Sequence, residues 1–265
     1  MQMCDIGGNI RLHYQVRGPE AAPALVLSGA LGTDLRMWDA LMLHLPTSLR
    51  IIRYDMRGHG LSTCPDGPYY MGDMVGDVAT LLDHLKVREA VFVGLSVGGM
   101  IGQGLAAERL DLVRALVLSN SAAKIATPAI WQARIDEIRQ NGIGAIAFAN
   151  MERWFSRRFR REHPGLVEAF LNMVMRQPLE GYLGTAAAIG ETDLYESTAR
   201  LRLPTLGIGG SEDGSTPPDL VRETTALIPG SRFELVRATG HLPAVEKPRE
   251  YAALLTSFLR DIGHI

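Results

Sequence analysis

Residues suited to nucleophilic catalysis occur in this 265-residue chain, and the first of them is Ser96. It lies within residues 94–98 (GLSVG), directly after the apolar run 91–93. The G-x-S-x-G spacing is typical of a serine on a sharp strand-to-helix turn, where flanking glycines leave room for the backbone. A helix that begins behind the serine directs free N–H groups toward a developing oxyanion. The five residues alone are equally compatible with an ordinary serine at a helix start.

A serine nucleophile needs a base, and His241 is the predicted one among seven histidines. It follows the predicted strand 233–236 and Gly240, on a loop at the edge of the sheet where Ser96 lies. His59 lies in a turn after the strand that ends at Asp55, and we expect its ring to hold that loop by hydrogen bonds. The other histidines lie in predicted strands, helices or the chain end: His13, His44, His84, His163 and His264.

The base needs an acid to orient it, and Asp213 is the predicted acid. It follows the strand 205–208 and precedes a helix opened by Pro217. Glu212 is the competing carboxylate, and a plain turn or helix-capping role is the alternative for Asp213. The chain order is then serine, aspartate, histidine.

An oxyanion hole needs two backbone N–H groups. Val97, which follows Ser96, supplies the first. The loop after the strand 24–27 supplies the second, and its small residues allow close approach of a ligand. We predict Leu31 as this donor, with Ala30 as the alternative.

Short buried strands alternate with helical segments along most of the chain, which predicts an α/β fold with a mostly parallel sheet of eight strands covered on both faces. The alternation stops between residues 121 and 200, where the sequence is helical and contains several aromatic residues and methionines. We expect this segment to be a helical cap (lid) inserted after the sixth strand, over the carboxyl ends of the strands. The core domain is then 1–120 and 201–265. Extra helices on an outer face of the sheet are the alternative.

The composition is that of an ordinary globular chain, with 46% hydrophobic residues and a net charge of −2. It predicts no nucleic-acid partner, no membrane span and no secretory signal. Cys4 and Cys64 lack metal-ligand spacing, and two free thiols favour a cytoplasmic location.

Taken together, these motifs resemble the α/β-hydrolase superfamily over nearly the whole chain, including its serine, aspartate, histidine order. The matching segments are 94–99 (GLSVGG), 55–62 (DMRGHGLS), 210–213 (GSED) and 240–243 (GHLP). Within the superfamily, further segments look like those of 3-oxoadipate enol-lactonases: 28–39 (SGALGTDLRMWD), 94–103, 119–125 (SNSAAKI) and 153–155 (RWF). The pair Ser28-Gly29 is shared with the lactonase type, whereas Ala30 stands where those lactonases often have a polar residue.

The resemblance implies hydrolysis of an enol-lactone to 3-oxoadipate in aromatic catabolism (the β-ketoadipate pathway), with no metal and no organic cofactor. Such a substrate carries a carboxylate, which needs a cationic partner. The predicted substrate-binding residues are Trp131 and Arg134, one helical turn apart, with Lys124 and Trp154. The arginine cluster 153–161 is expected to be mostly solvated, and the tryptophans could equally belong to the core of the cap.

Other functions fit the same scaffold, because fold does not fix substrate. A carboxylesterase, a carbon–carbon bond hydrolase and a cofactor-free perhydrolase are alternatives within the fold, and a non-catalytic ligand-binding protein is an alternative of another class. The partner expected in each enzymatic case is a small anionic lactone or ester. The sequence leaves open whether cap methionines and aromatic residues pack on the core or bury against a second copy in a homo-oligomer.

Overall fold

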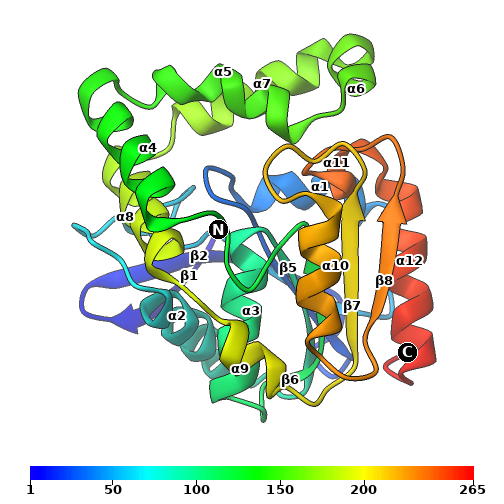
Figure 1. Cartoon of the computed structure of the whole chain (residues 1–265). Helices are drawn as coiled ribbons and strands as arrows, with labels where there is room; N and C mark the ends of the chain where they lie inside the picture. Colours follow the sequence, from blue (N-terminus) through cyan, green and yellow to red (C-terminus); the bar gives the residue numbers. More distant parts are fainter.

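One sheet of eight strands forms the centre of the protein in a computed structural model that describes residues 1–265 (Figure 1). In spatial order the strands are β1 (Gln2–Gly7), β2 (Ile10–Arg17), β4 (Arg50–Tyr54), β3 (Ala24–Ser28), β5 (Ala90–Leu95), β6 (Val113–Ser119), β7 (Thr205–Gly210) and β8 (Arg232–Val236). Strand β2 is antiparallel to both of its neighbours, and all pairs from β4 to β8 are parallel. The predicted mostly parallel eight-stranded sheet is confirmed.

The degree of burial explains which strands can be recognised in the sequence. Strands β3, β5 and β7 are buried at every residue, so they appear as continuous apolar or glycine-rich runs. Strand β1 lies at the edge of the sheet and buries Cys4 alone among its six residues. It therefore has no apolar run, and the sequence predicts no strand there.

Helices cover both faces of the sheet (Figure 1). They are the 3₁₀ helix η1 (Leu35–Trp38), α1 (Asp39–Met42), α2 (Met71–His84), α3 (Val97–Glu108), α10 (Pro218–Ala226), α11 (Pro243–Glu246) and α12 (Pro248–Asp261). Helices α2, α3 and α10 share one face, while α1 and α12 pack together on the other. The segment between β3 and β4 holds the two short helices η1 and α1, and Asp34 caps the first through its side chain.

Six helices lie between β6 and β7, so the predicted helical insertion after the sixth strand is present. They are α4 (Pro128–Asn141), α5 (Gly144–Trp154), α6 (Arg157–Glu162), α7 (Pro164–Met175), α8 (Leu179–Glu191) and α9 (Tyr195–Ala199). Figure 1 shows α4, α5, α6 and α7 stretched across the top, the side toward which the arrowhead of β8 points. Helix α9 instead packs on α3, where Thr198 Oγ1 donates to Gln103 Oε1 at 2.7 Å. We therefore propose α4 to α8 as the cap, and from here on "cap" means these helices.

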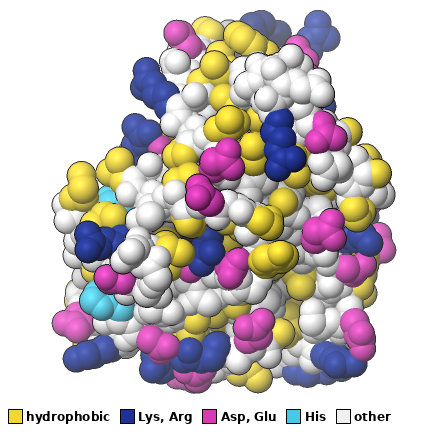
Figure 2. Space-filling view, turned by 90° about the vertical axis from the view of Figure 1, so that its left-hand side faces the viewer, with side chains coloured by type: hydrophobic (Ala, Val, Ile, Leu, Met, Phe, Trp, Pro, Cys, Tyr) yellow, Lys and Arg dark blue, Asp and Glu magenta, His cyan; other side chains and the backbone are white.

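The surface carries charges of both signs, which are interspersed on the face shown in Figure 2. That distribution agrees with the net charge of −2 and gives no single-sign field. None of the helices combines the length and the apolar character needed to cross a bilayer.

Candidate active site

Ser96 occupies a strained turn between β5 and α3. Its backbone angles are φ 58° and ψ −121°, in a region that residues other than glycine rarely adopt. The surrounding structure enforces this conformation, since Ser96 N–H donates to Ser119 O at 3.0 Å and Ser121 Oγ donates to Ser96 O at 2.6 Å. The serine side chain therefore projects from a fixed backbone into the pocket described below.

The two glycines of the motif are required by close backbone contacts. A Cβ at Gly94 would lie 2.2 Å from the carbonyl oxygen of Gly98, and a Cβ at Gly98 would lie 2.4 Å from the carbonyl oxygen of Ser28. Neither backbone can move aside without displacing the turn. Gly98 N–H also donates to Gly29 O at 3.1 Å, which joins α3 to the loop after β3.

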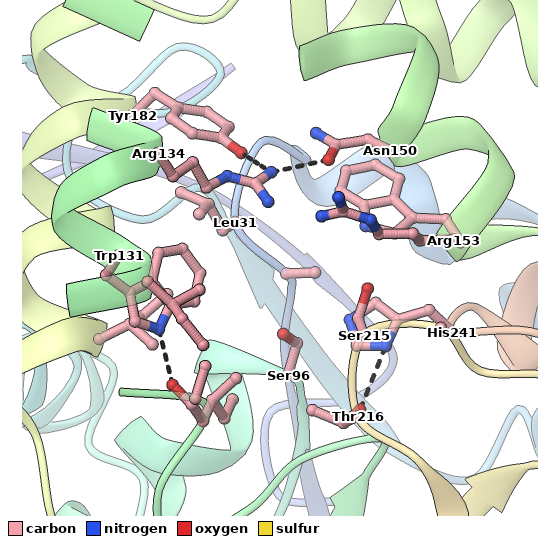
Figure 3. A pocket seen from close by; sticks show the side chains of 17 residues that line it. Leu31, Ser96, Trp131, Arg134, Asn150, Arg153, Tyr182, Ser215, Thr216 and His241 are labelled. Atoms are coloured by element: carbon pink, nitrogen blue, oxygen red, sulfur yellow. Dashed lines mark hydrogen bonds between the residues drawn. The ribbon is translucent and has the colours of Figure 1, made fainter. Parts of the chain in front are cut away.

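His241 and Asp213 form a buried pair at the same end of the sheet. His241 Nδ1 lies 2.8 Å from Asp213 Oδ2, and the side chains are 2% and 0% exposed. The backbone of His241 is held as well, because its N–H donates to Trp154 O at 2.8 Å. The imidazole lines the same pocket as Ser96 (Figure 3).

The Asp213 carboxylate accepts bonds at both oxygens. Oδ1 receives the N–H groups of Ser215 and Thr216 at 2.7 and 3.1 Å. Oδ2 receives Asn120 Nδ2 at 2.8 Å and Thr216 Oγ1 at 2.7 Å, besides facing His241. Burial alone would raise the pKa of Asp213, but the facing imidazole and these donors outweigh it and hold the pKa below its ordinary value.

Asn120 and Thr216 are supporting residues that the sequence analysis missed. Asn120 follows β6 and has a positive φ of 45°. Neither this backbone conformation nor the contact with Asp213 has a signal in the sequence. Glu212 is exposed, whereas Asp213 is buried beside the histidine. The geometry thus favours Asp213 of the two candidate acids.

His59 has the hydrogen-bonding role expected for it. Its Nε2 accepts from Gly32 N–H at 3.0 Å, so Nδ1 carries the proton and donates to Arg57 O at 3.1 Å. The ring is fully buried, and burial lowers the pKa of His59. It is therefore a neutral link between the turn 57–60 and the loop after β3.

Two backbone N–H groups near Ser96 are free for a ligand. Val97 is the first residue of α3, where N–H groups have no intrahelical acceptor. Leu31 N–H has no acceptor in the protein, whereas Ala30 N–H already donates to Thr33 Oγ1 at 3.1 Å. This difference favours Leu31 over Ala30 as the second donor.

A pocket of about 340 Å³ joins these groups to the cap. Its lining includes Leu31, Ser96 and His241 from the core and Trp131, Arg134 and Trp154 from the cap. No aspartate or glutamate lines it, although two arginines do. The pocket is therefore electropositive as well as partly apolar, with nine hydrophobic residues among seventeen.

Arg134 is held on the cap side of the pocket without a carboxylate partner (Figure 3). One terminal nitrogen donates to Asn150 Oδ1 at 2.7 Å and Tyr182 Oη at 2.6 Å, and its Nε is buried without a partner. The guanidinium also lies 5.6 Å from the Trp131 ring centroid. Neutral partners fix its direction and leave its charge uncompensated. Asn150 and Tyr182 had no signal in the sequence.

The remaining substrate-binding predictions have different outcomes. Trp154 lines the pocket and stacks on His241, with ring centroids 6.5 Å apart. Lys124 was expected in the pocket, and this is corrected: its ammonium lies outside and pairs with Asp193 at 3.0 Å on the surface. Arg153, which we assigned to a mostly solvated cluster, lines the pocket and makes no ion pair.

No group of three or more histidine, cysteine, aspartate or glutamate side chains is arranged to hold a metal ion. The chemistry available at the site is that of a serine hydroxyl, an oriented imidazole and two N–H donors. Such a set suits acyl transfer through an attack by serine on a carbonyl carbon.

Comparison with known proteins places the chain in a family. The family model described as alpha/beta hydrolase fold matches residues 22–248, so the chain belongs to that family. With its relatives below, this makes it an enzyme of the carboxylic ester hydrolase class.

Two relatives and one solved structure that are similar to this chain over nearly its whole length are enol-lactonases. The chain is 34% identical to 3-oxoadipate enol-lactonase 2 of Acinetobacter baylyi over 243 residues, which are 92% of this chain and 91% of the relative. It is 32% identical to 3-oxoadipate enol-lactonase 1 of the same organism, over 95% of this chain and 94% of that one. The crystal structure of the enol-lactonase from Burkholderia xenovorans has a TM-score of 0.92 and 34% identity, covering 96% of this chain and 98% of that chain.

Proposed function

We propose that this hydrolase opens the ring of 3-oxoadipate enol-lactone and yields 3-oxoadipate, with Ser96 as nucleophile, His241 as base and Asp213 as orienting acid. The observation that carries the substrate assignment is the uncompensated Arg134 in a pocket that also holds Ser96 and His241. The similarity to enol-lactonases supports the same assignment. The substrate carboxylate would bind Arg134, and the reactive carbonyl would lie at Ser96.

In the first step Ser96 Oγ attacks the lactone carbonyl carbon while His241 Nε2 takes the hydroxyl proton. The oxyanion formed accepts from Val97 and Leu31 N–H. Collapse breaks the ring C–O bond and expels an enolate, which is a better leaving group than an alkoxide. Asp213 stabilises the imidazolium throughout, and its depressed pKa keeps it ionised for that task.

In the second step the His241 imidazolium gives its proton to the enolate, and the enol so formed tautomerises to a ketone, so the tethered leaving group can no longer re-close the ring. His241 then removes a proton from water, and the hydroxide attacks the acyl-enzyme carbonyl. Ser96 leaves with the proton from His241, and the new carboxylate is released. The free thiols Cys4 and Cys64 fit a site of action in the reducing cytoplasm.

The test is ultraviolet monitoring of enol-lactone generated in situ, with wild type and Ser96→Ala. We expect rapid loss of the lactone with wild type and a rate near the uncatalysed background with Ser96→Ala, because the nucleophile is gone. A folded wild type that hydrolyses neutral esters and leaves the lactone intact would remove the substrate assignment and leave a general esterase.

The same assay tests the carboxylate contact through Arg134→Ala. We expect KM for the lactone to rise about 10- to 100-fold, because a charge-assisted bond contributes about 1.5–3 kcal/mol. KM for a neutral p-nitrophenyl ester should change less than about threefold. Arg157→Ala, an exposed arginine outside the pocket lining, is the matched control for loss of charge. Equal changes on both substrates would contradict the assignment.

A further inference from the structure

We propose that Gln177, in the connection between α7 and α8, is a positioning residue that holds the Leu31 N–H in place for the oxyanion. The inference rests on the proposed role of Leu31 and assigns the cap a part in the chemical step, in addition to substrate binding. Gln177 is 7% exposed and does not line the pocket that holds Ser96.

The Gln177 amide bridges two loops of the core. Its Nε2 donates to Gly32 O at 3.3 Å, and its Oε1 accepts from Gly60 N–H at 3.1 Å. A carbonyl can only accept and a backbone N–H can only donate, so these partners fix which end of the amide faces which loop. Gln177 thus joins the loop after β3 to the turn 57–60, across 145 and 117 residues of sequence.

Gly32 is held from both of its backbone polar groups. Its N–H donates to His59 Nε2 and its carbonyl accepts from Gln177, while Leu31 N–H on the preceding peptide stays free. On the other side of Leu31, Thr33 Oγ1 accepts from Ala30 N–H and donates to Ala30 O. The free donor therefore lies between two restrained residues. Gly32 has a φ of +82°, which glycine adopts without steric strain. The two hydrogen bonds are therefore not required to hold Gly32 in this conformation, and we assign them to fixing the direction of the neighbouring peptides.

The first turn of α8 docks rigidly beside the same loops. Gly181 lies so close to Gly58 that a Cβ on Gly181 would be 1.9 Å from Gly58 O. Tyr182 covers Gly32, where a Cβ would be 3.1 Å from the tyrosine ring. The position of Gln177 is therefore set by close backbone packing, which gives its amide a fixed place from which to direct Gly32.

Gln177→Leu, which keeps the approximate size and removes both bonds, tests the proposal on a p-nitrophenyl ester. We expect kcat to fall about 10- to 100-fold, because small displacements of positioned groups have effects of this size, with KM within about threefold. Affinity for an alkylboronic acid, whose tetrahedral adduct on Ser96 places an oxygen in the oxyanion position, should weaken by the same factor. Affinity for adipate, whose carboxylate carbons are trigonal and form no tetrahedral adduct with Ser96, should change less than about threefold.

A second variant separates the two halves of the amide. Gln177→Glu keeps an acceptor for Gly60 N–H and replaces the donor to Gly32 O by a carboxylate, so we expect a loss at least as large as for Gln177→Leu. Gln132→Leu is the matched control, since Gln132 is exposed on α4 and bonds only Asp136. It should leave every readout unchanged.

Several outcomes would overturn the proposal. The first is an unchanged kcat in Gln177→Glu. The second is a loss of affinity in Gln177→Leu that is equal for the boronate and for adipate and accompanies a fall in Tm, as a merely structural role predicts. The ester and boronate readouts do not depend on the natural substrate. Failure of the enol-lactone assignment would appear in the wild type alone and leave the comparison of variants intact.

Discussion

Two buried histidine–aspartate pairs in this protein have the same geometry and different surroundings. His241 Nδ1 lies 2.8 Å from Asp213 Oδ2, and His13 Nδ1 lies 2.8 Å from Asp55 Oδ2. Both aspartates also accept backbone N–H groups: Asp213 those of Ser215 and Thr216, and Asp55 those of Leu35 and Leu61. A short hydrogen bond between histidine and aspartate is therefore insufficient to define a catalytic base.

What differs is the cavity beside each imidazole. His241 shares its pocket with Ser96 and with the free N–H of Leu31. His13 borders a separate cavity of about 480 Å³ whose lining contains no serine, threonine or cysteine. The first pair has a nucleophile to activate, whereas the second ties β2 to the loops that follow β3 and β4. We infer that the first pair is catalytic and that the second is structural.

The largest expected difference comes from replacing each histidine by asparagine, whose amide takes the place of Nδ1 and removes Nε2. We expect His241→Asn to lower kcat by about 10⁴-fold or more, because the base is lost. His13→Asn should keep kcat within about threefold. Ester hydrolysis by the two purified variants measures this. Comparable losses in both would mean that the second pair takes part in the reaction.

Replacing the aspartates should separate activity from stability. Asp213→Asn should lower kcat about 10⁴-fold, since the imidazolium loses its stabilising charge and its preferred tautomer. Asp55→Asn should act mainly on folding, at a cost of roughly 1–3 kcal/mol, because the N–H groups of Leu35 and Leu61 and the ring of His13 lose the carboxylate that they share. Urea unfolding monitored beside kcat distinguishes the two. An Asp55→Asn protein of normal stability and low kcat would contradict this division.

The smallest expected effect is a pH dependence of stability that belongs to Asp213. Its folded pKa is depressed below the ordinary value of 3.8, so its contribution is present above about pH 4 and is lost as pH falls through the folded value. The free energy of unfolding of Asp213→Asn, measured against wild type from pH 7 to pH 3, should converge with wild type at the acidic end. Asp66→Asn, on an exposed loop, controls for the change in charge. A gap that widens on acidification would show the opposite shift.

Residues that share one short segment were predictable, because their roles follow from local backbone chemistry. The turn at Ser96 needs Gly94 and Gly98 within two residues, and the fully buried strands appear as apolar runs. Asp213 and His241 were predicted as acid and base from their places after strands, and the structure brings Asp213 Oδ2 and His241 Nδ1 within 2.8 Å of each other. Lys124 was misplaced because a lysine beside the cap has the same sequence signal whether it points into the pocket or pairs with Asp193.

The sequence alone determined the fold class, the insertion after the sixth strand and the three residues proposed for catalysis, because strand periodicity and glycine-dependent turns are local properties. Only the tertiary structure decided that Arg134 is held by Asn150 and Tyr182, that Leu31 rather than Ala30 has a free N–H, and that Gln177 reaches both Gly32 and Gly60. The contacts of Arg134 and Gln177 join residues from 16 to 145 positions apart, through side-chain directions that packing of the cap on the core selects.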